Sequence, residues 1–160
     1  MKTLIVYATR YGATEKASRT LARQLHGDIT LVNLVREDAP NPGTYDQVLI
    51  GGSIYAGSIQ KEVRQFCTAH QEQLLCQTIG LFVCCREEHT AREQLETSLG
   101  VDLVAHATST GSFGYEFDFS SMNIFFRLVI RILAKTKESQ FNLREEKIKE
   151  FAAHFAPDHS

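Results

Sequence analysis

The chain alternates between short runs of apolar residues and longer segments in which apolar residues recur at helical spacing. The apolar runs have the length of buried strands, and near-continuous runs such as KTLIVYA indicate strands covered on both faces. The strands predicted in this way lie at residues 2–8, 29–34, 47–51, 79–84 and 102–108. The helices predicted between and after them lie at residues 13–26, 60–74, 90–99 and 142–155.

Local signals predict where some of these segments end. Gly27 follows the first helical segment and Gly100 follows the third, as glycine commonly does at helix C-termini. Thr90 begins the third helical segment with capping-box spacing, because a glutamate lies three residues later. Pro40 and Pro42 lie close together between the second and third strands. This crossover is therefore predicted to be a loop with at most one helical turn.

Strands that alternate with helices predict an α/β fold. Such units connect through right-handed crossovers and build an open parallel sheet with helices on both faces. The 160 residues form one domain, residues 1–160, and five strands in this length fit a three-layer sandwich with strand order 2-1-3-4-5. In a sheet of this order, ligands bind beyond the carboxyl ends of the strands. The loops after the first, third and fourth strands are therefore the candidate site.

The loop after the first strand has the chemistry of an anion site. Backbone N–H groups at a strand-to-helix junction converge on one spot, where the helix dipole also favours negative charge. Thr9 and Thr14 add hydroxyl donors, and Gly12 allows a positive φ angle. The loop matches neither a P-loop nor a GxGxxG motif, and a simple helix cap and turn explains it equally well. The residues predicted to bind phosphate are Thr9, Arg10, Tyr11, Gly12, Ala13 and Thr14.

The loops after the third and fourth strands suit a flat aromatic ligand. The third strand leads into GGSIYAG, whose glycines permit close approach of the backbone and whose tyrosine offers a ring for stacking. The alternative is a glycine-rich turn with a surface tyrosine. The residues predicted to line one side of the ring are Ser53, Ile54, Tyr55, Ala56 and Gly57. Those predicted to approach the other side are Cys85, Arg86 and Glu87.

Composition and charge narrow the function classes. The formal net charge is −2 and the pI is about 6.3, so no basic excess indicates nucleic-acid binding. The spacings of cysteine and histidine fit neither a zinc site nor a C-x-x-C pair, so no metal site is predicted. The vicinal Cys84 and Cys85 are interpreted as inert core residues, with a redox pair as the alternative. The chain shows no membrane-spanning stretch and no cleavage site near its start, so a cytoplasmic location is expected.

The first loop resembles the phosphate loop of flavodoxins, T-x-[ST]-G-x-T, with matches at Thr9, Gly12 and Thr14. Tyr11 departs from this pattern, which usually has Ser or Thr there, so one hydroxyl contact to the phosphate is not implied. The GGSIYAG motif and the layout resemble more closely the flavodoxin branch that contains the menaquinone-dependent protoporphyrinogen IX dehydrogenases of heme synthesis. This resemblance extends over essentially the whole chain. It implies a flavodoxin-like fold, FMN as cofactor, and protoporphyrinogen and a quinone as partners.

An extra stretch follows the fifth predicted strand, at about residues 111–138. Four aromatic residues precede a predicted amphipathic helix, and Arg127, Arg131 and Lys135 recur every four residues as a basic stripe. Three interpretations are open for this insertion. It packs on the domain or forms a homodimer contact; it attaches through residues 122–135 to the inner face of the cell membrane; or it forms a lid over the flavin.

These observations favour an FMN-binding oxidoreductase whose flavin performs the redox chemistry. The first hypothesis is an enzyme that dehydrogenates protoporphyrinogen or a similar substrate and passes electrons to a quinone. The alternative is a flavodoxin-type electron carrier that docks on redox protein partners. The net charge of only −2 counts against the carrier, because the docking surfaces of flavodoxins are usually strongly acidic. The sequence identifies no catalytic acid or base.

Overall fold

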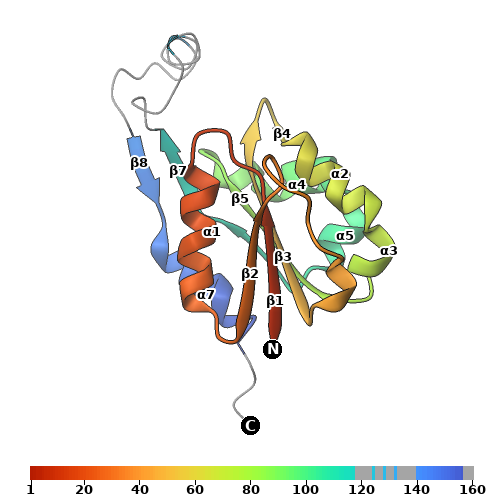
Figure 1. Cartoon of the computed structure of the whole chain (residues 1–160). Coiled ribbons are helices and arrows are strands. Elements are labelled where there is room, and N and C mark those ends of the chain that lie inside the picture. Colours follow the sequence, from red (N-terminus) through yellow and green to blue (C-terminus); the bar gives the residue numbers. More distant parts are fainter. Residues whose placement is uncertain (118–123, 125–127, 129–131, 133–139, 157–160) are drawn as a thin grey trace.

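The computed structural model describes residues 1–117, 124, 128, 132 and 140–156. The strands of its main sheet are β1 (Lys2–Tyr7), β2 (Asp28–Asn33), β3 (Gln47–Tyr55), β4 (Ser58–Ile59), β5 (Thr78–Cys84) and β6 (Ser109–Ser112). Five of them run parallel in the order β2-β1-β3-β5-β6, and β4 pairs antiparallel with the end of β3 (Figure 1). The predicted strand order is confirmed.

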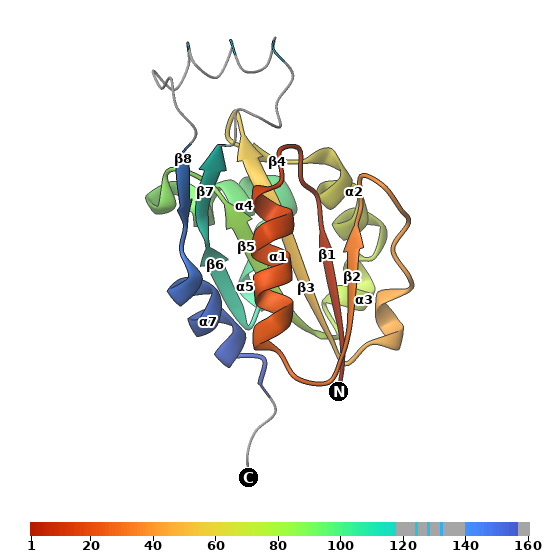
Figure 2. The same cartoon turned by 60° about the vertical axis from the view of Figure 1, so that its left-hand side comes forward.

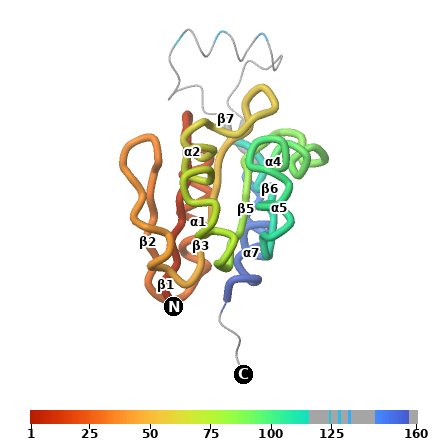
Figure 3. Tube along the Cα trace, turned by 90° about the vertical axis from the view of Figure 1, so that its right-hand side faces the viewer, coloured from red at the N-terminus to blue at the C-terminus, as the bar shows by residue number. Residues whose placement is uncertain are grey.

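Helices cover both faces of this sheet. They are α1 (Ala13–Gln24), α2 (Lys61–Ala69), α3 (Gln71–Leu74), α4 (Ala91–Leu99), α5 (Val101–His106) and α7 (Glu145–Ala153), with single 3-10 turns η1 (Pro42–Thr44) and η2 (Glu88–Thr90). Figure 1 shows α1 and α7 on one face and α2 to α5 on the other. Figure 3 faces the second side, where α2 lies over β3 and α4 lies over β5 and β6. The turn η1 confirms that the proline-rich crossover holds at most one helical turn.

Each face of the sheet has its own hydrophobic core. Leu4 of β1 points to the α2–α5 side, where Val63 belongs to the same buried cluster. The next residue, Ile5, points to the opposite side and joins Leu21 of α1 and Phe151 of α7. A fully buried side chain of this size contributes about 1.5–3 kcal/mol, so both faces help to stabilise the sheet. The near-continuous apolar runs of the sequence are therefore strands covered on both sides, as predicted.

The prediction of a strand at 102–108 is wrong. Val101–His106 forms α5, and the fifth parallel strand β6 begins only at Ser109. Gly100 has a φ of 94°, which lets a new helix start directly after α4 and bury the adjacent Leu103 and Val104. The strand itself reads Ser-Thr-Gly-Ser and is half-buried at the sheet edge, so it lacks the apolar run of the inner strands.

Three helix ends also differ from the prediction. Thr90 makes no side-chain cap on α4; its hydroxyl instead donates to the Glu87 carbonyl at 3.1 Å, so the capping box is not formed. The helix predicted at 60–74 divides at His70 into α2 and α3. His70 is a hydrogen-bonded packing residue: its ring lies 4.9 Å from that of Phe66, and its Nδ1 lies 3.2 Å from Gln73 Oε1. The last helix begins at Glu145, after a strand that the sequence did not reveal.

That strand belongs to a hairpin that carries the insertion. β7 (Gly114–Phe117) and β8 (Gln140–Leu143) pair antiparallel as a separate two-stranded sheet that lies near β6 in the turned view of Figure 2. Within the insertion, the described residues Ile124, Leu128 and Ile132 are helical. The predicted basic stripe Arg127, Arg131 and Lys135 lies outside the described residues, as do most of the residues assigned to a membrane contact or a lid. In the described part of the chain, no helix is long and apolar enough to cross a membrane.

Candidate functional site

Three loops gather at the carboxyl ends of β1, β3 and β5. The β1 loop and the β3–β4 hairpin project from the same end of the sheet (Figure 2). The start of the first loop is held against β3, because the Ala8 amide donates to the Gly51 carbonyl at 3.2 Å. This is the position at which the strand order reverses between β1 and β3, where ligands of such sheets bind.

The first loop leaves the N-terminus of α1 open to an anion. Gly12 is the N-cap, with a φ of 94°, and no side chain caps the helix. The first helical hydrogen bond runs from the Lys16 amide to the Gly12 carbonyl, so the preceding amides of the first turn have no acceptor within the helix. Thr9 Oγ1 accepts the Gly12 N–H at 2.9 Å and keeps its own proton for a ligand. These neutral donors and the helix dipole fit a phosphate.

A buried hydroxyl pair joins the first loop to β3. Thr14 Oγ1 lies 2.6 Å from Ser53 Oγ, and the exposed fractions of the two residues are 0% and 6%. Two hydroxyls carry two protons, and their mutual hydrogen bond uses only one of them. The second proton is available to an acceptor, and an anion at the start of α1 is the acceptor that the helix dipole favours. Ser53, predicted to line the ring, therefore meets the phosphate loop instead of standing apart from it.

Gln60 is a site residue that the sequence analysis missed. Its Oε1 accepts the Ser53 N–H at 2.8 Å, which fixes the orientation of the side-chain amide. Its Nε2 is buried and has no hydrogen-bond partner among the described residues. A Cβ on Gly52 would lie 2.8 Å from Gln60 Oε1, so a glycine is needed there to admit the amide. The glycine-rich stretch just before it was the available signal.

The β3–β4 hairpin forms the second loop. Ile54 and Tyr55 still belong to β3, and a tight turn through Ala56 and Gly57 connects them to β4. Ala56 has a φ of 49° and is the one non-glycine residue with a positive φ in the described chain. This conformation costs an L-residue roughly 1–2 kcal/mol, so the hairpin tip stores strain at the predicted ring site.

Aromatic and cationic groups bring the first two loops together. The Tyr11 and Tyr55 rings meet edge to face, with centroids 6.0 Å apart and an interplanar angle of 75°. The Arg10 guanidinium lies 5.8 Å from the Tyr55 centroid, within cation–π range. Burial raises the pKa of the Tyr55 hydroxyl, so its side chain stays neutral at physiological pH. The geometry thus unites three residues that the sequence had assigned to two separate loops.

The loop after β5 makes its contacts with β6. Cys85 Sγ lies 3.3 Å from Ser112 Oγ and 3.6 Å from the Glu87 carbonyl oxygen. Burial raises the pKa of the Cys85 thiol, which keeps it protonated near neutral pH. Cys84 is also buried, which fits the interpretation of both cysteines as core residues. Arg86 and Glu87 are exposed on this loop.

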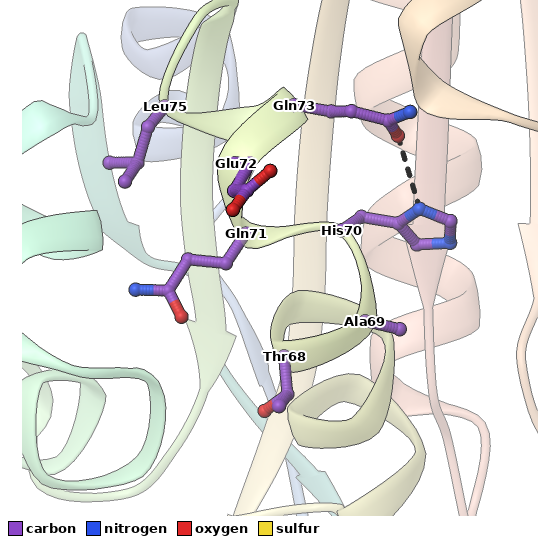
Figure 4. A pocket seen from close by; sticks show the side chains of 7 residues that line it. All are labelled: Thr68, Ala69, His70, Gln71, Glu72, Gln73 and Leu75. Carbon is purple, nitrogen blue, oxygen red and sulfur yellow. Dashed lines mark hydrogen bonds between the residues drawn. The ribbon is translucent and has the colours of Figure 1, made fainter.

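One further cavity lies away from the three loops. A shallow depression of about 540 Å³ lies at the junction of α2 and α3, and it is lined by one continuous stretch from Thr68 to Gln73 with Leu75 (Figure 4). It lies toward the C-terminal end of α2, whereas the three loops lie at the carboxyl ends of the strands. Within the described ranges, no cluster of His, Cys, Asp and Glu is arranged to hold a metal ion.

Comparisons with known proteins identify the family of this chain. A sequence model of the family described as "Flavodoxin domain" matches residues 4–143. The protoporphyrinogen IX dehydrogenase [quinone] of Escherichia coli K12 is 34% identical over 77 residues, which are 46% of this chain and 42% of that protein. The match thus spans less than half of either chain.

Solved structures share the fold. Oxidised flavodoxin 1 from Bacillus cereus superposes with a TM-score of 0.59 at 14% identity and covers 97% of both chains. A flavoprotein in complex with FMN from Lactobacillus acidophilus has a TM-score of 0.51 at 14% identity, covering 71% of this chain and 91% of its own. The family match and the donors at the start of α1 together support FMN as the cofactor. The chain belongs to the flavodoxin domain family.

Proposed function

We propose that this protein is an FMN-dependent oxidoreductase that binds the cofactor at the β1, β3 and β5 loops. The observation that carries the proposal is the uncapped N-terminus of α1 beside the buried Thr14–Ser53 hydroxyl pair. A phosphate there receives backbone N–H groups, the positive end of the helix dipole and one spare hydroxyl proton. When bound, the isoalloxazine ring accepts and donates the electrons; the chain supplies binding and orientation.

The residues divide into a phosphate side and a ring side. On the phosphate side, the proton chain runs from Ser53 to Thr14 and from Thr14 to a phosphate oxygen. On the ring side, Tyr55 offers an aromatic face, and the backbone of the β3–β4 hairpin approaches one edge. The backbone of residues 85–87 approaches the other side.

For the reaction, we propose dehydrogenation of protoporphyrinogen or a similar substrate with transfer of electrons to a quinone. The supporting observation is the 34% identity to a protein of that activity, limited to 77 residues. The test is anaerobic mixing of the FMN-loaded protein with protoporphyrinogen, followed by addition of menaquinone. Bleaching of the flavin absorption by the first reagent and its return with the second are expected. Absence of bleaching, together with rapid exchange of electrons with a redox protein, would favour the flavodoxin-type carrier instead.

The insertion favours a peripheral membrane contact as part of this function. Ile124, Leu128 and Ile132 are 81%, 55% and 68% exposed, and their spacing of four places them on one helical stripe. The basic residues of the sequence recur at the same spacing of four, and basic residues attract anionic lipid headgroups at about 1 kcal/mol each. We expect binding to anionic vesicles that weakens with salt. If the protein binds neutral and anionic vesicles equally poorly at low salt, this part of the proposal is wrong.

A further inference from the structure

We propose that Glu88 is a positioning residue that holds residues 85–87, called the ring-side loop below, against α7 and thereby sets the affinity for the flavin ring. This link between Glu88 and α7 is called the clamp. The inference rests on the proposed binding of FMN at this site. Glu88 directly follows Cys85, Arg86 and Glu87, the residues predicted to approach the ring.

Two cations, one in α7 and one at its N-cap, contact the Glu88 carboxylate. Lys147 Nζ donates a hydrogen bond to Glu88 Oε2 at 2.6 Å, and the Arg144 guanidinium faces Oε1 at 2.9 Å. The Glu88 side chain is 28% exposed, so the pair is only partly screened by solvent. These contacts join residues 56 and 59 positions apart in the sequence, which is why no local pattern reveals them.

The clamp spans the edge of the sheet. Lys147 lines two small grooves of about 190 and 250 Å³, and both grooves are also lined by Thr110, Gly111 and Ser112 of β6. The Lys147–Glu88 bridge therefore ties α7 to η2 beside the outer strand. A lysine beside an edge strand hinders pairing of that edge with another chain. This role alone would not require its carboxylate partner to be Glu88, the residue that directly follows the ring-side loop.

The loop between β5 and Glu88 is fixed from both of its ends. At its start, Cys85 Sγ contacts Ser112 Oγ, and at its end Thr90 Oγ1 donates to the Glu87 carbonyl. Glu88 adds the link to α7, whose N-cap Arg144 also donates its backbone N–H to the Phe113 carbonyl. Since β8 ends at the residue before Arg144, the same cation connects the ring-side loop to the insertion hairpin.

The clamp should affect the binding of the flavin ring and leave the binding of the phosphate unchanged. Glu88→Gln keeps the shape of the side chain but removes the charge that both cations face. We expect the affinities for FMN and for riboflavin to fall by the same factor. This factor is about two- to fivefold, because partly exposed ion pairs contribute little. Lys147→Met should have a similar effect, and Glu88→Gln should add little in its background. The matched control is Glu96→Gln, which breaks the exposed Arg92–Glu96 pair on α4 and should leave both affinities unchanged.

The experiment is fluorescence titration of the apoprotein variants with FMN and riboflavin, together with deuterium exchange of residues 85–90 in the apoprotein. Equal losses for both flavins and faster exchange in Glu88→Gln support the clamp. Unchanged flavin affinity in Glu88→Gln, or a loss confined to FMN, overturns it. A wild-type protein that binds neither flavin refutes the proposed function itself, whereas wild-type binding with an inert Glu88→Gln refutes only the clamp.

Discussion

The Thr14 hydroxyl is the most informative single group to remove. Thr14→Val keeps the branched shape of the side chain and deletes the oxygen that lies 2.6 Å from Ser53 Oγ. In the free protein this breaks one hydrogen bond, worth about 0.5–1.5 kcal/mol. It also leaves the buried Ser53 hydroxyl without its partner, which brings the destabilisation to about 1–3 kcal/mol.

The effect on binding depends on whether Thr14 donates to the phosphate. A hydrogen bond to a charged group contributes about 1.5–3 kcal/mol, so its loss should weaken FMN roughly 10- to 150-fold. Riboflavin has no phosphate, and its affinity should scarcely change. Ser53→Ala should act in the same direction through Thr14, and the double variant should lose little more than Thr14→Val alone.

Quenching of flavin fluorescence measures both affinities on the same apoprotein. Ser58→Ala is the matched control, because this serine lies on the same hairpin and contacts Ser98 and the Ile59 carbonyl instead of Thr14. Its ratio of FMN to riboflavin affinity should equal that of the wild type. If Thr14→Val weakens the two flavins equally, the hydroxyl pair serves the fold and the proposed proton chain to the phosphate is wrong.

Three further changes test other parts of the structure. Ala56→Gly should raise the free energy of unfolding by about 0.5–1 kcal/mol in urea, since glycine relieves the positive φ but loses more chain entropy; a loss of stability would show that this backbone is unstrained. Gly80→Ala should destabilise by about 1–3 kcal/mol, because its Cβ would lie 2.5 Å from the Phe155 ring, and an unchanged melting temperature would contradict that packing. Iodoacetamide at pH 8 should alkylate the exposed Cys76 first. Burial raises the pKa of the Cys85 thiol, so alkylation of Cys85 should increase only at pH values above the ordinary cysteine range. Equal rates of alkylation of the two cysteines, measured by mass spectrometry, would refute the burial argument.

The sequence predicts most of the sheet because the inner strands obey a simple physical rule. Strands covered on both faces are mostly apolar where they are buried, and β1, β3 and β5 each contain such a run, at residues 4–6, 48–50 and 81–83. The edge strand β6 escapes this rule, since it is half-buried and built from small polar residues. The apolar residues just before it pack as the short helix α5, which buries the adjacent Leu103 and Val104.

The site is predictable in its location but not in its connections. The switch point follows from strand order, and the loop residues follow from their chemistry. The contacts of Gln60 with Ser53 and of Glu88 with Lys147 join separate elements and depend on side-chain directions in three dimensions. The Glu88–Lys147 pair, 59 positions apart, leaves no periodic or local signal in a single sequence, and the signal for Gln60 is limited to the nearby glycine-rich stretch. Tyr11 illustrates the same point, because its edge-to-face contact with Tyr55 joins two loops that are far apart in the sequence.

Titration of the purified apoprotein with FMN, in parallel with FAD and NAD, tests the central claim most directly. The account predicts that FMN binds with a stoichiometry of about 1:1 at the single switch-point site and that it binds more tightly than either dinucleotide. Failure to bind FMN, or a clear preference for FAD or NAD, would contradict the assignment of the three loops as an FMN site.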